Sequence, residues 1–338
     1  MDKKAVSLFV SGLFIGLIIA VFGFTWYVRE HGVSGSTDTI VLKLGHGLQP
    51  SHPVHKAMLF MADRLAEKSG GTVKLEVYPS GQLGSETANI EQLQRGILAM
   101  TKVSAAPMES FIPEMTVFNL PYVFRDEEHY WNVLNSPLGK ELLIKGQDKG
   151  LRGLCYYDSG SRNFYTVNTP ILKPDDLIGL KIRVQKSETA INMVKALGGS
   201  PTPIAWGELY TSLQQGAVNG AENNLPSFYT NRHYEVCKAF TMDSHTRVPD
   251  ILLISTKVWD GLPAQVQQWV QESADESVPY QRKLWQEDTQ TSLEAVQNEG
   301  VKVYYPDLKP FEEKVQPLLA EYKGTVVGEM LDRIREMQ

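Results

Sequence analysis

Two arginines and a pair of asparagines are the residues of this chain with the clearest capacity for chemistry. Arg162 follows a run of small residues, Arg183 lies inside an apolar run, and Asn223 ends a third segment. A guanidinium is planar, so it can hold a carboxylate through two parallel charge-assisted hydrogen bonds. Spacing alone leaves a second interpretation open, because an arginine at the edge of a strand is often a solvated surface residue.

The sequence lacks the motifs that identify common enzymes and metal centres. It contains no phosphate-binding Walker loop, no glycine-rich dinucleotide turn, no HExxH zinc motif and no serine elbow. Its seven histidines and two cysteines are scattered, without the spacing of metal ligands. We therefore expect a protein without catalytic residues, cofactor or metal.

Composition and charge indicate a globular protein. With 338 residues, 42% of them hydrophobic and 21% charged, the chain can build two ordinary domains that each have a core. The formal net charge is -6, and no block of basic residues could follow a phosphate backbone. Nucleic acid is therefore not an expected partner.

The N-terminal segment, residues 1–36, is predicted to enter or cross a membrane. Lys3 and Lys4 precede an uncharged run from Ala5 to Val28. This run is longer than an ordinary signal-peptide core, so two interpretations stay open, a cleaved signal peptide, which is favoured, and an uncleaved anchor. Either one places the rest of the chain in the periplasm, outside the inner membrane.

The two cysteines lie far apart in apolar settings. A single disulfide between Cys155 and Cys237 is compatible with an oxidising compartment, but two unrelated buried thiols are favoured. No cysteine directly follows the N-terminal segment, which excludes lipid attachment there.

The elements that must position these residues alternate between strands and helices. Apolar runs indicate strands at 40–44, 73–77, 151–157, 180–184 and 251–255. Ser85 and Ser187 are expected to cap two of the helices.

A long helix is predicted over 263–299, with a kink or a short break at Pro279. Such a helix could span two domains. No Gly/Ser linker or internal repeat separates the halves of the chain, so the two domains are expected to exchange strands rather than follow one another. The predicted fold class is α/β, with two lobes of mixed sheet, crossing strands and a domain-spanning helix.

Distinctive segments occur at 78–84, 120–122, 159–164, 180–184, 199–203, 206–208 and 218–223. In order and spacing they resemble the solute-binding subunits of tripartite ATP-independent periplasmic (TRAP) transporters, from about residue 40 to the last helix. The resemblance implies a two-lobed periplasmic binding protein fold of the type II-like kind. The first lobe is then expected over 37–159 with 249–285, and the second over 160–248 with 286–338.

The resemblance also implies roles for residues in a cleft between the lobes. Arg183 matches the arginine that grips the ligand carboxylate in this family, and Arg162 matches a second arginine near it. Asn223 matches an amide that binds the same group, and Asn224 is expected beside it. Trp206 stands where the family places a ring against the ligand.

Other residues match the opposite wall and its supports. Glu86 and Ser104 lie at or near positions that line the facing wall in relatives. His46 follows the first strand, where a binding loop is expected to start. Glu222 and His245 are expected to hold Asn223 or an arginine in place by hydrogen bonds.

The segments at 52–56, 206–210 and 222–229 are similar to those of family members that resemble binders of sugar acids such as glucuronate and galacturonate. Glu86 can accept hydrogen bonds from sugar hydroxyls and would repel the far carboxylate of a dicarboxylate. The Trp206 ring can pack on a pyranose. A hexuronate is therefore the predicted ligand, with C4-dicarboxylates and open-chain hexonates left open.

The implied partners are this small organic acid and the membrane permease subunits of a TRAP transporter, and a monomer is expected. Two other classes stay open. One is a periplasmic enzyme acting on a sugar acid, with His46 or His245 recruited as a base, and the other is a ligand-sensing module that docks on a receptor.

Overall fold

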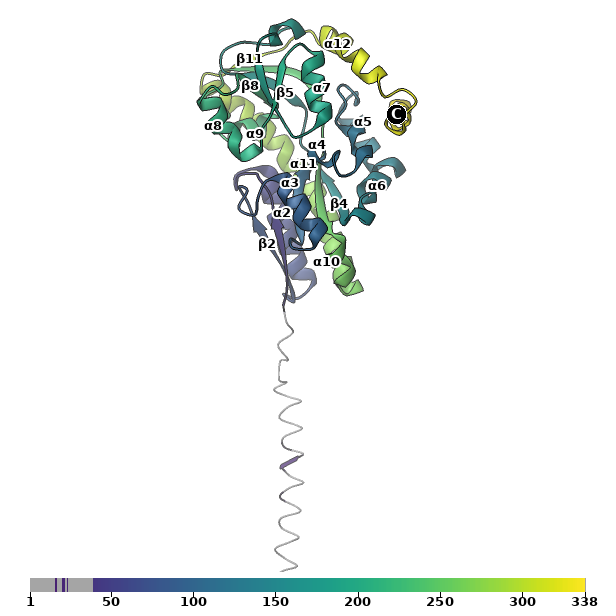
Figure 1. Ribbon diagram of the computed structural model, residues 1–338. Coiled ribbons are helices and arrows are strands. Elements are labelled where there is room, and N and C mark those ends of the chain that lie inside the picture. The colour runs from purple at the N-terminus through teal and green to yellow at the C-terminus, as the bar shows by residue number, and fades with distance from the viewer. Residues whose placement is uncertain (1–15, 17–19, 22, 24–38, 338) are drawn as a thin grey trace, which may run out of the picture. The chain divides into compact units, whose positions relative to one another are not determined.

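The computed structural model describes Gly16, Ala20, Val21, Gly23 and residues 39–337 (Figure 1). The N-terminal segment predicted over 1–36 therefore lies outside the described residues, apart from those four positions. Residues 1–40 and 41–338 separate into two units, and the second carries both β-sheets except for Ile40. Within the described part of the chain, no helix has the length and apolar character needed to span a bilayer.

The first sheet has five strands in the order β2-β1-β3-β10-β4. β1 and β3 are parallel, whereas β10 is antiparallel to both β3 and β4. The strands are β1 (Ile40–Gly45), β2 (Val73–Tyr78), β3 (Met100–Ser104), β4 (Leu151–Tyr157) and β10 (Asp250–Ser255). The accompanying helices are α2 (Pro53–Lys68), α3 (Glu86–Arg95), α4 (Ala105–Met108), α5 (Glu127–Asn135), α6 (Pro137–Ile144) and α10 (Thr256–Gly261), with 3-10 turns η1 (Pro113–Phe118) and η2 (Gln147–Lys149). We call this part the first lobe.

The second sheet has six strands in the order β11-β9-β5-β8-β6-β7. They are β5 (Arg162–Thr166), β6 (Lys181–Val184), β7 (Ser200–Pro203), β8 (Gly220–Asn223), β9 (Ala239–Thr246) and β11 (Lys302–Tyr304). The accompanying helices are α7 (Glu188–Ala196), α8 (Leu209–Gln214), α9 (Leu225–Thr230) and α12 (Lys309–Ala320), with 3-10 turns η3 (Pro174–Leu177), η4 (Trp206–Glu208) and η5 (His233–Glu235). We call this part the second lobe.

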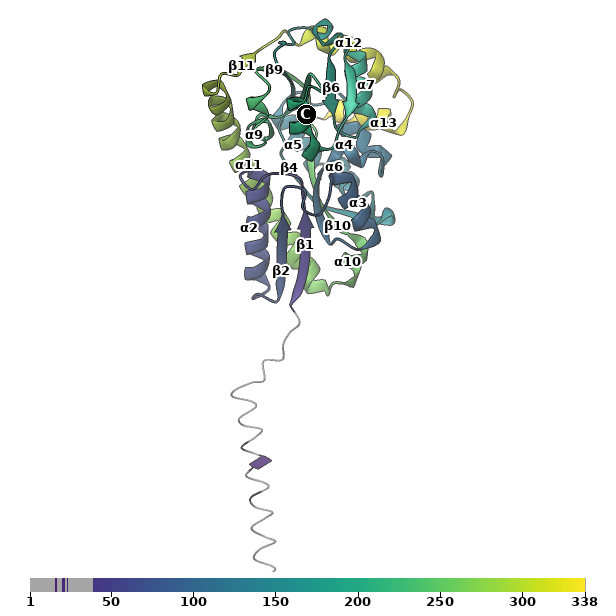
Figure 2. The same cartoon turned by 60° about the vertical axis from the view of Figure 1, so that its left-hand side comes forward.

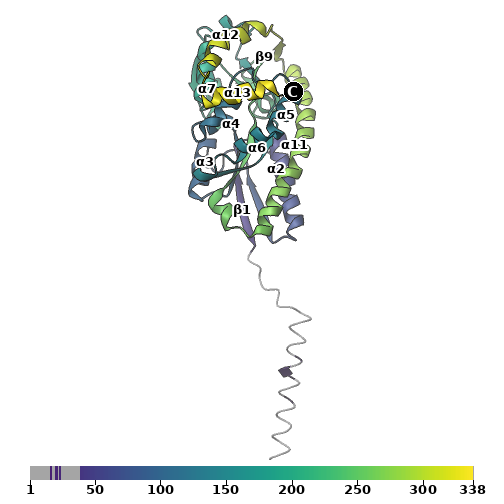
Figure 3. The same ribbon diagram turned by 90° about the vertical axis from the view of Figure 1, so that its right-hand side faces the viewer.

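Two strand connections, one helix and the C-terminal link at 321–325 join the lobes. β4 leads into β5, and β9 leads into β10, so the chain crosses to the second lobe and returns. In the first crossing, Gly160 has a φ of +57°, and a Cβ there would lie 3.0 Å from Nε1 of Trp285, so glycine is favoured at this position. The helix α11 (Ala264–Asn298) packs against α2 and β4 of the first lobe and α9 of the second (Figures 2 and 3).

Local signals in the sequence match the observed ends of elements. Ser85 caps α3 by accepting from the N–H of Ala88, and Ser187 caps α7 by accepting from Ala190, so both predicted caps are confirmed. α11 continues through Pro279, which excludes a break there. The fold class is also confirmed, since two mixed sheets, crossing strands and a long helix are all present.

Separate clusters of buried side chains form the interiors of the lobes. One in the first lobe includes Val103, and two in the second lobe include Phe164 and Phe240. Cys155 and Cys237 are both buried and free, one in each lobe, which is the outcome that the sequence favours.

The last helix returns to the first lobe. α12 packs against α7 and β9 of the second lobe, whereas α13 (Val326–Glu336) packs against η1 and adds Met330, Leu331 and Ile334 to the first-lobe cluster. The expected lobe boundaries stay a prediction, and this packing does not support them for the C-terminal part of 286–338. Periodicity along the chain identifies the buried face of such a helix but not the lobe that covers it.

Candidate functional site

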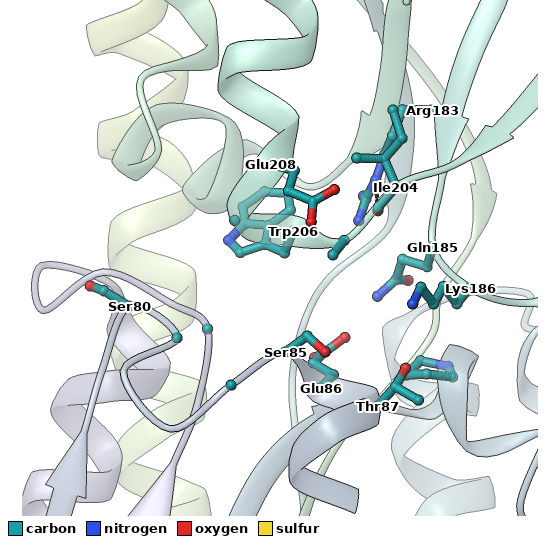
Figure 4. Close-up of a pocket in the computed structure, with 16 residues that line it drawn as sticks. Ser80, Ser85, Glu86, Thr87, Arg183, Gln185, Lys186, Ile204, Trp206 and Glu208 are labelled. Carbon is teal, nitrogen blue, oxygen red and sulfur yellow. Dashed lines mark hydrogen bonds between the residues drawn. The ribbon is translucent and has the colours of Figure 1, made fainter.

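Two cavities that share several lining residues lie between the lobes beside Arg162 and Arg183. The larger has a volume of about 250 Å³ and the smaller about 40 Å³, and both are lined by Gly47, Glu86, Gln185 and Trp206. Figure 4 shows the larger cavity, with Glu86 of the first lobe on one side and Arg183 and Trp206 of the second lobe on the other. The two lobes therefore contribute facing walls.

Strand direction explains why distant residues meet here. β6 and β8 are parallel, so Arg183 near the end of β6 and Asn223 at the end of β8 lie at one edge of the sheet. β5 is antiparallel to β8, which brings its first residue, Arg162, to the same edge. In the first lobe, Ser104 ends β3 and pairs with Asp250, the first residue of the antiparallel β10.

Arg162 is held by Glu222 across the pair of strands β5 and β8. Its Nε donates to Oε2 of Glu222, and its Nη2 donates to Oε1 (2.9 Å) and to the main-chain oxygen (2.8 Å) of the same residue. Nη1 donates to Oδ1 of Asn223 (3.0 Å). Four of the five N–H groups of a guanidinium are thus engaged, and one on Nη1 remains for the smaller cavity, which Arg162 lines.

Glu222, His245 and Asp243 form a chain of buried ion pairs that begins at Arg162. Nε2 of His245 lies 3.5 Å from Oε2 of Glu222, and Nδ1 lies 2.6 Å from Oδ2 of Asp243. Burial favours the neutral form of Glu222, but Arg162 and His245 outweigh it and lower its pKa to about 2. Burial likewise opposes a charged His245, yet Asp243 and Glu222 raise its pKa to about 9. Because the charges alternate, Arg162 supplies the cavity with an oriented donor more than with net positive charge.

Arg183, in contrast, is a buried cation without an acidic partner. It is 2% exposed, its Nε donates to the main-chain oxygen of Ile204 (2.9 Å), and its Nη1 is buried with no hydrogen-bond partner. No carboxylate in the described part of the chain forms an ion pair with it. Burial lowers the pKa of Arg183. An anion with two oxygens would compensate both the buried charge and the unpaired N–H.

Trp206 forms a wall common to both cavities. The centre of its ring lies 5.6 Å from the guanidinium carbon of Arg183 and 5.0 Å from the centre of the His233 ring. Its position between Arg183 and His233 fixes the ring beside the unpaired cation, so a ligand held by Arg183 would contact an aromatic surface.

The two asparagines keep their N–H groups for the cavity. Oδ1 of Asn223 accepts from Arg162 and from the main-chain N–H of Asn224 (2.9 Å), and Oδ1 of Asn224 caps α9 by accepting from Ser227 (2.8 Å). Neither Nδ2 donates to a residue that the structure describes. Both asparagines line the smaller cavity, so each can donate to an anion there.

The first-lobe wall is built from charged groups. Oε1 of Glu86 accepts from the main-chain N–H of Ser104 (3.0 Å) and lies 3.7 Å from Nζ of Lys102. Lys102 in turn pairs with Asp250 (3.0 Å). Burial raises the pKa of Glu86, against the opposing effect of Lys102. The hydroxyl of Ser104 lies 3.4 Å from Oε1 of Gln185 in the second lobe, so it contacts the opposite wall directly.

His46 lines neither cavity. Its side chain is fully buried, its Nε2 lies 2.9 Å from Nδ1 of His55, and its Nδ1 accepts from the main-chain N–H of Leu48 (3.1 Å). Both ring nitrogens are therefore engaged inside the first lobe, and the structure gives no support to the predicted contact with a ligand. Gly47, the next residue, lines the cavities in its place.

The lining residues that were not predicted as site residues include the polar side chains of Lys102, Gln185 and Asp250. For Lys102 a signal was available in the sequence, because it is a charged residue between Thr101 and Val103 at the centre of a short strand. No group of three or more His, Cys, Asp or Glu residues is placed to hold a metal ion within 39–337 or at the four described positions before it.

The sequence matches the family model of the bacterial extracellular solute-binding proteins, family 7, over residues 44–325. The chain belongs to this family. It is therefore an extracytoplasmic solute-binding protein of a transport family, and its predicted likeness to TRAP solute-binding subunits is confirmed.

Individual relatives share most of their length with this solute-binding protein. It is 31% identical over 322 residues to the C4-dicarboxylate-binding periplasmic protein DctP of Rhodobacter capsulatus, which covers 94% of this chain and 96% of that one. It is similar to the crystal structure of a TRAP solute-binding protein from Xanthobacter autotrophicus Py2 with bound β-D-galacturonate, with a TM-score of 0.85, 38% identity and coverage of 88% and 100%. A TRAP solute-binding protein from Anaerococcus prevotii with bound α/β-D-glucuronate gives a TM-score of 0.84, 35% identity and coverage of 88% and 98%.

Proposed function

We propose that this solute-binding protein captures a hexuronate such as glucuronate or galacturonate between its lobes and delivers it to the membrane permease subunits of a TRAP transporter. The observation that carries the proposal is the buried, unpaired guanidinium of Arg183 at the wall of a cavity. The uronates bound to two similar solute-binding proteins support the choice of ligand.

The ligand carboxylate lies at Arg183, where each charge-assisted hydrogen bond contributes about 1.5–3 kcal/mol net. The remaining N–H of Arg162 and the amides of Asn223 and Asn224 complete the donor set. The net charge of -6 opposes an anion only weakly at this distance, because physiological salt screens surface charges over about 8 Å.

The rest of the ligand extends between Trp206 and the first lobe. The ring of Trp206 packs against the C–H face of the pyranose, and Glu86 and Ser104 face its hydroxyls. Glu222 and His245 act through Arg162, which they hold in place. The lobes are expected to close over the sugar as they do in hinge-type binding proteins.

We also propose that the ligand leaves chemically unchanged. The two histidines considered as bases are both buried away from the cavities: His46 bonds to His55, and His245 lies between Asp243 and Glu222. A general base must lie within hydrogen-bond reach of the proton it removes. The protein is proposed to act as a monomer in the periplasm.

C4-dicarboxylates are the alternative ligand, because DctP of Rhodobacter capsulatus is a C4-dicarboxylate-binding relative. The composition of the first-lobe wall argues against them. A second carboxylate would lie against Glu86 and Asp250, whose two charges exceed that of Lys102.

A thermal-shift screen of the purified protein tests the proposal. D-galacturonate and D-glucuronate are expected to raise the melting temperature by several degrees at saturating concentration, because they bind the folded form only. Succinate and D-gluconate serve as comparison ligands. Stabilisation by succinate without any by the uronates would overturn the proposed ligand, and recovery of a chemically altered uronate by mass spectrometry would overturn the absence of catalysis.

A further inference from the structure

A buried lysine lies in the cavity wall opposite the two arginines. Lys102 is 3% exposed and belongs to β3, next to the antiparallel strand β10. Leu252 lies directly across from Lys102, and Asp250 lies across from Ser104, so Lys102 and Asp250 are diagonal neighbours on one face of the sheet. Glu86, at the start of α3, completes what we call the first-lobe charge cluster: Glu86, Lys102 and Asp250.

The cluster is only partly satisfied within the protein. An ammonium group has three donors, and Asp250 takes one of them at 3.0 Å, while Oε1 of Glu86 at 3.7 Å is beyond hydrogen-bond distance. Oε2 of Glu86 and Oδ1 of Asp250 accept no hydrogen bond from the residues that the structure describes. Glu86 keeps 21% of its side chain exposed, because it faces the cavity.

Fold stability does not explain such a cluster. Burying a charged pair removes both ions from water, and well-packed apolar residues of similar size usually stabilise a core at least as well. The three residues all line the smaller cavity, together with Arg162 and Asn223 of the facing lobe. Spare donors and acceptors therefore point to a polar group of a ligand.

The pattern of free groups defines which polar group fits. Each hydroxyl of a sugar both donates and accepts, so two adjacent hydroxyls can donate to the free oxygens of Glu86 and Asp250 and accept from Lys102. A carboxylate only accepts, and it would meet two like charges and one opposite charge. The cluster thus fits the neutral, hydroxylated end of a molecule.

We propose that the first-lobe charge cluster binds two adjacent hydroxyl groups of the ligand and thereby selects a sugar acid over a dicarboxylate. This inference rests on the proposed function, because it requires the ligand carboxylate to be held by Arg183 in the facing wall. It assigns specificity to Lys102 and Asp250.

The test compares affinities for D-galacturonate and succinate by calorimetry. Lys102→Met combined with Asp250→Leu replaces the ion pair by apolar side chains of similar size, so that neither member of that pair is left buried without its partner. The affinity for D-galacturonate divided by the affinity for succinate is expected to fall at least tenfold, because D-galacturonate binding is weakened. Asp250→Asn, which keeps the shape, is expected to change the ratio in the same direction.

Lys43→Met is the matched control, since Lys43 is an exposed lysine of the neighbouring strand β1. It is expected to leave both affinities unchanged. An unchanged ratio in Asp250→Asn and in a double variant that melts cooperatively would overturn the inference while leaving uronate binding intact. A wild-type protein that binds no hexuronate would instead overturn the proposed function, and the role of the cluster with it.

Discussion

Arg162 and Arg183 are the same kind of residue in opposite electrical situations. Arg162 is neutralised by Glu222, which His245 and Asp243 support in turn. Among the residues that the structure describes, Arg183 donates only to the main-chain oxygen of Ile204, and its charge faces the cavity without an acidic partner. Arg162 can therefore orient a ligand carboxylate through one hydrogen bond, whereas Arg183 can also attract it through an uncompensated charge. Both arginines were predicted to lie near the same carboxylate.

The variant Arg183→Lys tests whether ligand binding needs the planar guanidinium of Arg183 or only its positive charge. Lysine keeps the positive charge but loses the planar pair of donors, so at least one charge-assisted hydrogen bond to the carboxylate is lost. That loss is worth about 1.5–3 kcal/mol, or about ten- to hundredfold in the dissociation constant for D-galacturonate, measured by calorimetry. Lys181→Ala, an exposed change on the same strand, is the control. Equal affinity in Arg183→Lys and wild type would remove Arg183 from its proposed role.

His245 gives the folded protein a specific dependence on pH. Its pKa is raised to about 9 from an ordinary value of 6.5, so its stabilising contribution is complete below pH 6.5 and is lost as the pH rises through 9. The difference in unfolding free energy between wild type and His245→Gln should therefore shrink between these two pH values. Urea titrations across this range measure it. A difference that stays constant with pH would show that His245 is not charged in the folded state.

At the scale of elements, the site depends on strand ends and on helix caps next to them. Parallel and antiparallel pairings bring the ends of β5, β6 and β8 to one edge, and those of β3 and β10 to the facing edge. The helices that follow are fixed by side chains: Ser187 caps α7, and Asn224 caps α9. The same short segments thus end strands, line the cavities and start helices.

Ser187→Ala tests how much one such cap contributes. The hydroxyl of Ser187 accepts from the main-chain N–H of Ala190 at 3.0 Å, and loss of an N-cap costs about 1 kcal/mol. The melting temperature is expected to fall by about 2–4 °C in calorimetry. Ser212→Ala, a change at a half-buried serine inside α8, should shift it by less than half as much. Equal shifts in the two variants would argue against a capping role.

At the scale of the whole molecule, few side-chain contacts link the lobes beside the cavities. Glu109 of the first lobe accepts from the main-chain N–H of Thr189 (3.1 Å) and from its hydroxyl (2.8 Å), at the start of α7. Nε2 of His52, the residue that caps the start of α2, lies 3.2 Å from the hydroxyl of Ser227 on α9. These contacts add to the crossing strands and α11 as links between the lobes.

Glu109→Ala is expected to favour the open arrangement of the lobes. The change removes two hydrogen bonds to the second lobe, which makes the closed arrangement less favourable in free energy. The ligand must then offset this difference when it binds, so its net binding free energy is smaller. Affinity for D-galacturonate should fall by about tenfold, and the radius of gyration of the unliganded protein should increase in X-ray scattering. Glu141→Ala, on the exposed face of α6, is the control. Unchanged scattering and affinity in Glu109→Ala would exclude this contact as a determinant of closure.

Much of the fold was predictable from local patterns. The strands at 151–157 and 251–255, the caps at Ser85 and Ser187 and the long helix depend on residues close together in the sequence. The return of α13 to the first lobe was not predictable, because an amphipathic helix shows a buried face without showing its partner. The contact of His46 with His55 was not predictable for a similar reason, since His55 lies on the following helix and the pairing depends on how that helix packs.

The sequence by itself determined that this protein is α/β, that it resembles a solute-binding subunit, and that arginine and amide side chains cluster along one stretch of chain. These properties reside in period, capping and residue type, which are local. Only the tertiary structure decided that Glu222 neutralises Arg162, that Arg183 stays unpaired, and that Lys102 meets Asp250 from 148 residues away. The net charge of a buried site depends on which charged groups the fold brings within a few ångströms of one another. Those distances cannot be predicted from the order of residues in the chain.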